Sequence, residues 1–212
     1  MTYGLKFTNN SDVVTLDSEL SRLVVLYSAR YSGSANFPTP ITSQEPPLVF
    51  VKPDANATFQ WIRILGEPGN WTGWANTYPV NVNGEYFVAA YASKETATYG
   101  MRLWDGGSKL LFDNGTPCAQ FSLVITSWTY LGAVNTSPGR WSSTWASTAP
   151  LSNGDFMMIN NIAMDLPGSN SFSKLSVMWD YTNNRVVVGL QNIGDFDGNS
   201  LFLPVFFAKK IT

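Results

Sequence analysis

Tyr3-Gly4-Leu5-Lys6-Phe7-Thr8 is followed, near the start of this chain, by the polar run Asn9-Asn10-Ser11-Asp12 and then by Val13-Val14-Thr15-Leu16-Asp17. In the first segment, apolar residues alternate with small or polar ones, with the period of two that a strand with one buried face requires. The polar run between two apolar runs is composed of turn-forming residues. Residues 3–17 therefore predict an antiparallel β-hairpin.

The same pattern returns 96 positions later, at Tyr99-Gly100-Met101-Arg102-Leu103-Trp104-Asp105. The polar turns correspond, Asn9–Asp12 with Asp105–Ser108, and the second strands end alike, at Leu16-Asp17 and Phe112-Asp113. A β-rich run follows each copy. This internal repeat predicts two β-domains that each open with a hairpin. A common hairpin solution used twice remains the alternative.

Strand signals dominate the rest of the chain. Leu23–Tyr27 fits a helical stripe as well as a strand, but its β-rich composition favours a strand. The 12 prolines and 17 glycines break every long helical window. We therefore expect an all-β fold of two antiparallel β-sandwich-like domains, residues 1–96 and 97–212, with one large β-sandwich as the alternative. Further segments rich in aromatic and β-branched residues are Gln60–Leu65, Glu85–Tyr91, Phe121–Trp128, Phe156–Ile162, Lys174–Trp179, Trp179–Val188 and Leu201–Ala208.

The composition excludes several kinds of chemistry. The 212 residues include no histidine and one cysteine, so a Ser-His-Asp triad, an imidazole zinc ligand and an internal disulfide are all excluded. Only 13% of residues are charged and the net charge is −2, whereas about 25% charged is typical of a globular domain. No cationic face for nucleic acid is visible, so we expect no nucleic-acid partner.

No segment of the sequence predicts membrane insertion. The N-terminal residues lack the apolar core of a secretory signal. The longest apolar runs, such as Leu23–Tyr27, are far shorter than the roughly 18 residues that a spanning helix needs. We expect a protein that is made in a cytosol and does not insert into a membrane.

The opening Tyr3-Gly4-Leu5 hairpin, with Phe7, Asn9, Leu16 and Asp17, resembles small proteins of tailed bacteriophages that are encoded near the central tail fibre and tail-tip genes. Many of them begin with Met-x-Tyr-Gly-Leu-x-apolar-x-Asn/Asp, a short turn and a second strand that ends in Asp. The match covers about the first 18 residues well and the second hairpin more loosely. The resemblance implies a component of the virion tail, assembled in the host cytoplasm, and carries over no catalytic residue.

Two segments rich in Gly, Pro and Asn carry tryptophans and are interpreted as loops. A flat aromatic ring flanked by Asn, Thr or Arg suits a sugar, which presents a C–H face and a rim of hydroxyls. Packing at the end of a sandwich, or against a neighbouring subunit, is the alternative. Trp104, Trp128 and Trp179 lie in predicted strands and are expected in the core. The candidate binding residues, for a glycan or a protein, are Trp71, Trp74, Tyr78, Arg140, Trp141 and Trp145.

The acidic residues give weaker signals. Asp195-Phe196-Asp197-Gly198-Asn199 resembles the first part of a calcium loop, with Asp195, Asp197 and Asn199 as ligands, but the downstream glutamate is missing. We expect an ordinary turn and no cofactor there, with calcium as the alternative. Paired carboxylates are the remaining route to glycoside hydrolysis, but no spacing sets any pair apart among Glu67, Glu85, Asp155, Asp165 and Asp180.

Together these features predict a non-enzymatic structural component of a bacteriophage tail tip or tail fibre assembly that aids host attachment. Residues 1–96 would attach to the assembly, and residues 97–212 would face a surface or receptor. The expected partners are other tail proteins, further copies of this chain around a threefold tail axis, and a bacterial surface glycan or protein. The alternatives are a carbohydrate-binding module or lectin that uses the tryptophans, and a β-sandwich glycan hydrolase.

Overall fold

The computed structural model describes residues 6–8, 14–17, 22–78, 82–91, 95–108, 110–151, 154–162, 165–166, 173–193 and 201–211. Within these ranges every strand pairing is antiparallel, and the one helical element is a turn of 3-10 helix, η1 (Asn160–Ile162). The predicted all-β fold is therefore confirmed. The ambiguous segment Leu23–Tyr27 lies in a strand.

The strands follow the predicted segments, with some differences at their ends. Phe156–Ile162, for example, is a three-residue strand followed by η1. The strands in chain order are β1 (Lys6–Thr8), β2 (Val14–Asp17), β3 (Leu23–Ser32), β4 (Ser34–Ile41), β5 (Leu48–Pro53), β6 (Ala57–Glu67), β7 (Asn70–Tyr78), β8 (Asn83–Tyr91), β9 (Arg102–Trp104), β10 (Leu110–Asp113), β11 (Cys118–Ile125), β12 (Trp128–Ser137), β13 (Arg140–Ser147), β14 (Phe156–Met158), β15 (Asp165–Leu166), β16 (Ser173–Asp180), β17 (Arg185–Ile193) and β18 (Val205–Ile211).

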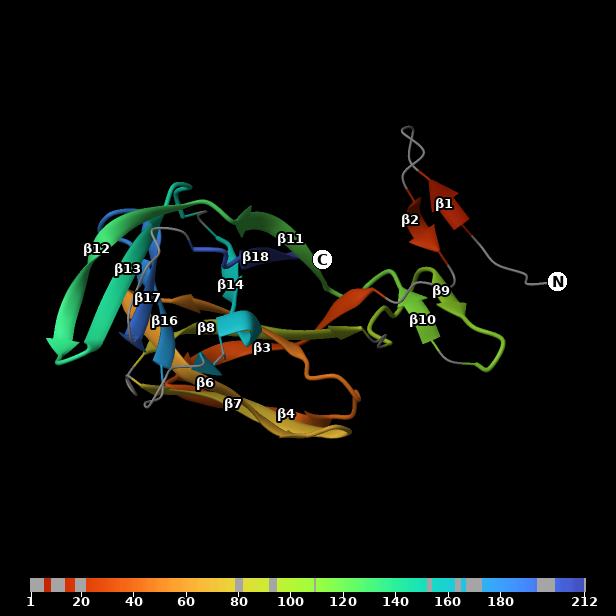
Figure 1. The fold of residues 1–212 in the computed structure, drawn as a ribbon. Coiled ribbons are helices and arrows are strands. Elements are labelled where there is room, and N and C mark those ends of the chain that lie inside the picture. The colour runs from red at the N-terminus through yellow and green to blue at the C-terminus, as the bar shows by residue number, and fades with distance from the viewer. Residues whose placement is uncertain are drawn as a thin grey trace.

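The body of the molecule is one continuous sheet that folds back on itself, and two separate hairpins, β1–β2 and β9–β10, lie at one end of it (Figure 1). The strand order in the large sheet is β11-β18-β14-β5-β8-β3-β4-β7-β6-β16-β17-β13-β12. Because β11 also pairs with β3, through Cys118 and Val24, the first six strands of this order close into a ring. The remaining strands form a second layer.

Alternate side chains of the ring strands point to opposite sides, as the period of two requires. Those that face the inside of the ring form a small apolar cluster that includes Phe50, Phe87 and Phe156. The rings of Phe50 and Phe87 are stacked with 4.6 Å between centroids. The alternate residues, among them Val49 and Val51, belong instead to the main core.

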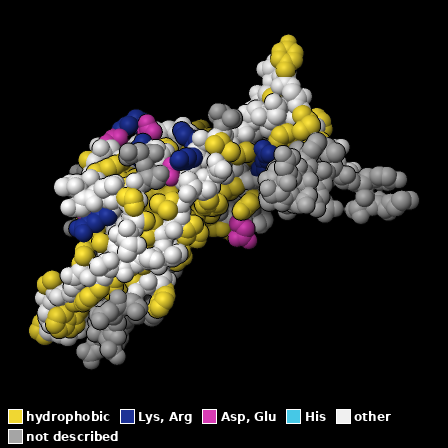
Figure 2. Space-filling model, turned by 90° about the horizontal axis from the view of Figure 1, so that it is seen from above, with side chains coloured by type: hydrophobic (Ala, Val, Ile, Leu, Met, Phe, Trp, Pro, Cys, Tyr) yellow, Lys and Arg dark blue, Asp and Glu magenta, His cyan; other side chains and the backbone are white. Residues whose placement is uncertain are grey.

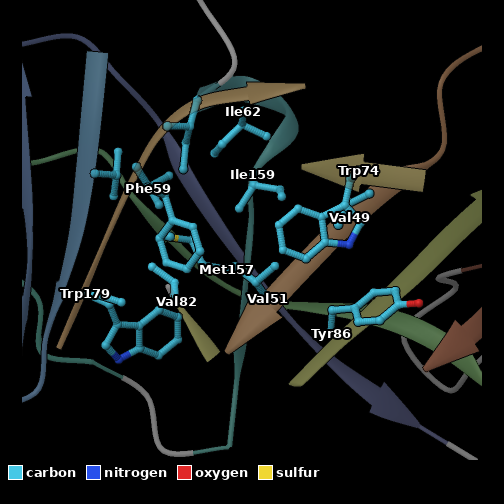
Figure 3. Packing of buried hydrophobic residues seen from close by; sticks show 14 of the residues in the cluster. Val49, Val51, Phe59, Ile62, Trp74, Val82, Tyr86, Met157, Ile159 and Trp179 are labelled. Carbon is cyan, nitrogen blue, oxygen red and sulfur yellow. The ribbon is translucent and has the colours of Figure 1, made fainter. Parts of the chain in front are cut away.

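The main core lies between the ring and the second layer, in a sandwich-like arrangement. Figure 3 shows Trp74 and Phe59 from the second layer beside Val51 and Met157 from the ring. All four side chains are fully buried. Burying an aromatic or large aliphatic side chain contributes about 1.5–3 kcal/mol, so this interface is the chief source of stability in the fold.

Strands on both sides of the expected boundary near residue 96 belong to the large sheet. The first half contributes the neighbouring sets β5-β8-β3 and β4-β7-β6, and the second half contributes β11-β18-β14 and β16-β17-β13. Three ladders join the halves: β3 with β11, β5 with β14, and β6 with β16. Two domains, 1–96 and 97–212, would share these three ladders. The division into domains stays a prediction.

Candidate interaction surfaces

The two tryptophan-bearing segments are β-hairpins, not open loops. In each, only Pro-Gly forms the connection: Pro68-Gly69 joins β6 to β7, and Pro138-Gly139 joins β12 to β13. Gly69 has φ = 83° and Gly139 has φ = 72°. A type II turn requires a positive φ at its third residue and commonly has proline at its second, which is the pattern of both connections. The tryptophans therefore lie in strands, where pairing decides which way they face.

In the first hairpin the tryptophans pack into the core. Trp74 is fully buried, and its ring lies 4.9 Å from that of Tyr31 and 5.9 Å from that of Tyr86. Trp71 is 8% exposed and donates its Nε1–H to the carbonyl of Ser43 at 2.9 Å. Neither ring presents an open face to a ligand.

The second hairpin is more exposed at its tip than at its base. Trp145 is fully buried against Tyr130, with 5.5 Å between ring centroids. Arg140 and Trp141, directly after the turn, are half-buried. Tyr78 belongs to the first hairpin, where its backbone pairs with Gln60, and its side chain lies outside the described residues.

The six candidate binding residues are thus not brought into one site. The two hairpins are separated in the sheet by β16 and β17, and their fully buried tryptophans cannot contact a sugar while the protein is folded. Only Arg140 and Trp141 have side chains that are described and accessible, so binding by this pair stays a prediction.

Trp179 is in the core as expected and Trp128 is half-buried, but the same expectation for Trp104 is wrong, because its side chain is 51% exposed.

The buried carboxylates that the hydrolase alternative would require are each held by a cation. Asp155 accepts a hydrogen bond from Ser122 Oγ at 2.6 Å and lies 3.4 Å from Lys209 Nζ. Asp180 accepts hydrogen bonds from Arg185 Nε at 3.0 Å and from the amide and side chain of Asn183. Burial alone would raise the pKa of Asp180, but these hydrogen bonds outweigh it and lower the pKa. A general acid needs a raised pKa, which Asp180 lacks.

The remaining candidates do not form a catalytic pair in the described part of the chain. Glu67 and Glu85 are exposed, and the side chain of Asp165 lies outside the described residues. No group of three or more acidic or cysteine side chains that could hold a metal ion occurs among the described residues. Asp195, Asp197 and Asn199, the weak calcium candidates, lie outside them.

Strand β12 forms the open edge of the large sheet. Among the described strands it pairs only with β13. The strand has no charged residue, and Leu131 and Val134 are 47% and 68% exposed. Figure 2 shows hydrophobic side chains along the arm at the left, where β12 and β13 lie in Figure 1. A long, uncharged, apolar edge strand is a template for pairing with another chain.

The second exposed apolar surface belongs to the β9–β10 hairpin. Tyr99, Met101 and Trp104 are 89%, 41% and 51% exposed. A shallow hollow of about 410 Å³ lies beside Met101 and Trp104, with Ala97 and Arg102 also in its wall. Exposed apolar side chains gathered on a protruding element mark an interaction surface.

A buried carboxylate fixes the shape of this hairpin. Asp113 accepts hydrogen bonds from Arg102 Nε at 2.8 Å, from the amide of Gly115 at 2.8 Å, and from the amides of Thr96 and Ala97. Burial alone would raise its pKa, but these donors hold the pKa well below its ordinary value. The carboxylate is therefore ionised at neutral pH, where it holds the loop before β9 against β10.

A third surface feature is a hollow of about 590 Å³ where β5 begins and β8 ends. Leu48, Ala89 and Tyr91 line it together with residues 43–46. The polar groups of Asn160 at its wall are already used, because Asn160 accepts from the amide of Val49 and donates to the carbonyl of Pro47. The hollow therefore offers mainly apolar contact.

Comparisons with protein-family models, curated proteins and solved structures found no match to this chain. No helix in the described part of the chain is long and apolar enough to cross a membrane.

Four exposed apolar residues of these two surfaces, Tyr99, Met101, Leu131 and Val134, were not among the candidates from sequence. Tyr99 and Met101 belong to the repeated motif, so their recurrence was the available signal. Val134 and Leu131 are exposed because β12 is an edge strand, and which strand lies at the edge depends on the strand order of the whole sheet. The alternation of residues along β12 alone does not show that it is an edge strand.

Proposed function

We propose that this chain is a non-enzymatic structural component of a bacteriophage tail tip or tail fibre assembly, where it binds other tail proteins and aids attachment to the host. The carrying observation is the placement of exposed apolar side chains on two protruding elements, the open edge of β12 and the β9–β10 hairpin. Such surfaces are costly to leave in water and become favourable when a partner covers them.

The chemistry of the described residues supports a binding role over a catalytic one. The buried carboxylates Asp113, Asp155 and Asp180 are each paired with a cationic side chain, so they are occupied in holding the fold. The complete burial of Trp74 and Trp145 weighs against the lectin alternative, which needs open ring faces. The resemblance of the first hairpin to small tail proteins supports the tail over other assemblies.

The test is quantitative mass spectrometry of purified phage particles that encode this chain. We expect the chain at a fixed number of copies per particle, retained through gradient purification. Its absence from washed particles would overturn the proposal. The identity of the neighbouring genes is an independent check, because a tail protein should be encoded beside a long central-fibre gene.

A further inference from the structure

Six strands from each half of the chain are arranged alike in the large sheet, and β12 and β15 of the second half have no counterpart in the first. In the first half, β8 lies between β3 and β5, and β7 lies between β4 and β6. In the second half, β18 lies between β11 and β14, and β17 lies between β13 and β16. Each of the three ladders that join the halves pairs corresponding strands: β3 with β11, β5 with β14 and β6 with β16. This is the arrangement of two copies of one unit around an approximate twofold axis.

Side-chain directions repeat along with the strand order. In β8, Phe87 and Ala89 face the inside of the ring while Tyr86 and Val88 face the main core. Corresponding residues of β18 divide in the same way. Ala208 belongs to the apolar cluster inside the ring, which we call the inner cluster, and Phe206 packs against it. Val205 and Phe207 are in the main core.

The ladder between β5 and β14 also maps onto itself when the copies are exchanged. Phe50 lies opposite Met158, and both belong to the inner cluster. Val51 pairs with Met157 on one side of this pair, and Ile159 donates its amide to the carbonyl of Val49 on the other. The axis therefore passes between Phe50 and Met158.

The two hairpins are copies of each other in register as well as in sequence. In β1–β2, Lys6, Phe7 and Thr8 lie opposite Asp17, Leu16 and Val14. In β9–β10, Arg102, Leu103 and Trp104 lie opposite Asp113, Phe112 and Leu110. All six positions differ by 96, and the irregularity falls after the same pair in both. A hairpin reused by chance would not share its register, its bulge and its cationic–acidic first pair.

Both hairpins leave the body at equivalent places. The β3–β11 ladder pairs Val24 with Cys118, and the amide of Val25 donates to the carbonyl of Pro117. Continuing this register places Leu23 opposite Ala119, which also differ by 96 positions. Each hairpin therefore precedes its ring strand by the same short connection, and Figure 1 shows both at the same end of the molecule. Arg22 holds the second hairpin there, with its guanidinium 4.4 Å from the ring of Phe112.

We infer that the two hairpins are a duplicated docking unit that binds two adjacent copies of one homo-oligomeric protein, each copy receiving one hairpin in an apolar site. The inference rests on the proposed function only in taking that protein to be part of the tail. A homo-oligomer presents the same site more than once, and a chain that carries two copies of a binding surface gains avidity when both copies engage such sites together. The exposed Tyr99, Met101 and Trp104 supply the apolar contact of the second unit. Tyr3 and Leu5 hold the positions in the sequence that correspond to Tyr99 and Met101, and they lie outside the described residues.

The first experiment places a photo-crosslinking amino acid, p-benzoylphenylalanine, at Tyr3 in one full-length variant and at Tyr99 in another, each produced during infection. We expect both positions to crosslink to the same peptide of the same partner. The matched control is Phe202, which is 93% exposed and precedes the first residue of β18. The other end of β18 pairs with Cys118, close to the second hairpin, so Phe202 should not yield that peptide. Crosslinks to two different proteins, to different sites, to a second copy of this chain, or to nothing at either position would overturn the inference.

A second experiment tests whether the two units act together. Replacing both Met101 and Trp104 by serine, in the variant that carries the crosslinker at Tyr3, removes apolar contact from one hairpin only. Because two linked sites gain roughly 100-fold or more in avidity, the crosslink yield at Tyr3 should fall at least about tenfold. The thermal unfolding midpoint should stay unchanged, since both side chains are exposed. An unchanged yield would mean that the units bind independently and would overturn the bivalent docking.

The outcomes separate this inference from the proposed function. If both hairpins crosslink to one site of one oligomer but washed particles lack the chain, the docking stands and the tail assignment fails. If the chain is present in particles but the hairpins contact different proteins, the tail assignment stands and the docking unit fails.

Discussion

The hydroxyl of Tyr31 is buried in the main core and has no hydrogen-bond partner among the described residues. Burial, together with the nearby Asp54 and Tyr181, raises its pKa above the ordinary value of 10. A folded-state pKa above the unfolded one means that the fold tolerates the neutral hydroxyl better than the ionised one, so the free energy of unfolding is independent of this titration below about pH 10 and falls as the pH rises further. The group is therefore a source of alkaline instability as well as an unsatisfied polar atom.

Tyr31→Phe should stabilise the protein. Removing an unsatisfied buried hydroxyl is worth about 1 kcal/mol in the free energy of unfolding. Urea denaturation at neutral pH measures this gain, and a second series above pH 10 should show a smaller loss of stability than in the native chain. Tyr99→Phe, at a side chain that is 89% exposed, is the control and should change neither series. A destabilised Tyr31→Phe would show that the hydroxyl has a partner, such as a buried water.

Asp113 gives the β9–β10 hairpin a pH dependence of the opposite sign. Its folded-state pKa lies below the ordinary carboxyl value of 3.8, so its stabilising effect is complete above that value and is lost as the pH falls towards the folded pKa. In NMR spectra, the amide signals of Ala97 and Gly115, which donate to Asp113, should hold their folded positions at neutral pH and move during acidification.

The variant Asp113→Asn should lose the folded positions of these two signals already at neutral pH, because the amide cannot accept all the donors that the carboxylate accepts. Glu95→Gln is the control: Glu95 is exposed and contacts the same arginine, Arg102, at 3.0 Å, but it holds no backbone amide in this network. If Asp113→Asn kept both signals in place, the carboxylate would not be what fixes the hairpin.

At the scale of elements, β12 is the strand whose position makes a testable difference. Val134→Lys places a charge on an exposed edge, so the free energy of unfolding should change by no more than about 0.5 kcal/mol. Pairing of β12 edges between copies of the chain should decrease, and light scattering of the purified protein measures this self-association. Val188→Lys, the same change at a fully buried position in β17, should unfold the protein. Equal destabilisation by both changes would show that the β12 edge is covered.

Strand positions were largely predictable from sequence because alternation and β-branched composition are local properties. The orientation of Trp71 and Trp74 was not, because both are buried although strict alternation would place them on opposite faces. The register shifts at Gly66, which has φ = 107°, and this bulge lets both rings reach the core.

The repeat was visible in sequence only at its hairpins. Between them, the copies share strand order and burial pattern but few residue identities, so long-range pairing alone reveals the rest.

At the scale of the whole molecule, low charge determines how the protein responds to salt. Only 13% of the residues are charged, and ion pairs such as Arg30–Asp54 lie on the surface, where they contribute little. The apolar hairpin and edge surfaces carry the proposed contacts. Sodium chloride screens charges strongly, since the Debye length falls from about 30 Å at about 0.01 M to about 3 Å at about 1 M, but it weakens apolar burial little.

The crosslink yield at Tyr99 should therefore stay within about twofold across this range of sodium chloride, because the contacts of the proposed docking unit are not ion pairs. Sodium sulfate, which strengthens apolar burial, should leave the yield unchanged or raise it. The control is the exposed pair Arg30–Asp54, whose contribution to stability, measured by a double-mutant cycle, should decline as chloride is added. A yield that fell tenfold in chloride would show that charged groups, rather than the exposed tyrosine, methionine and tryptophan, hold the hairpin to its partner.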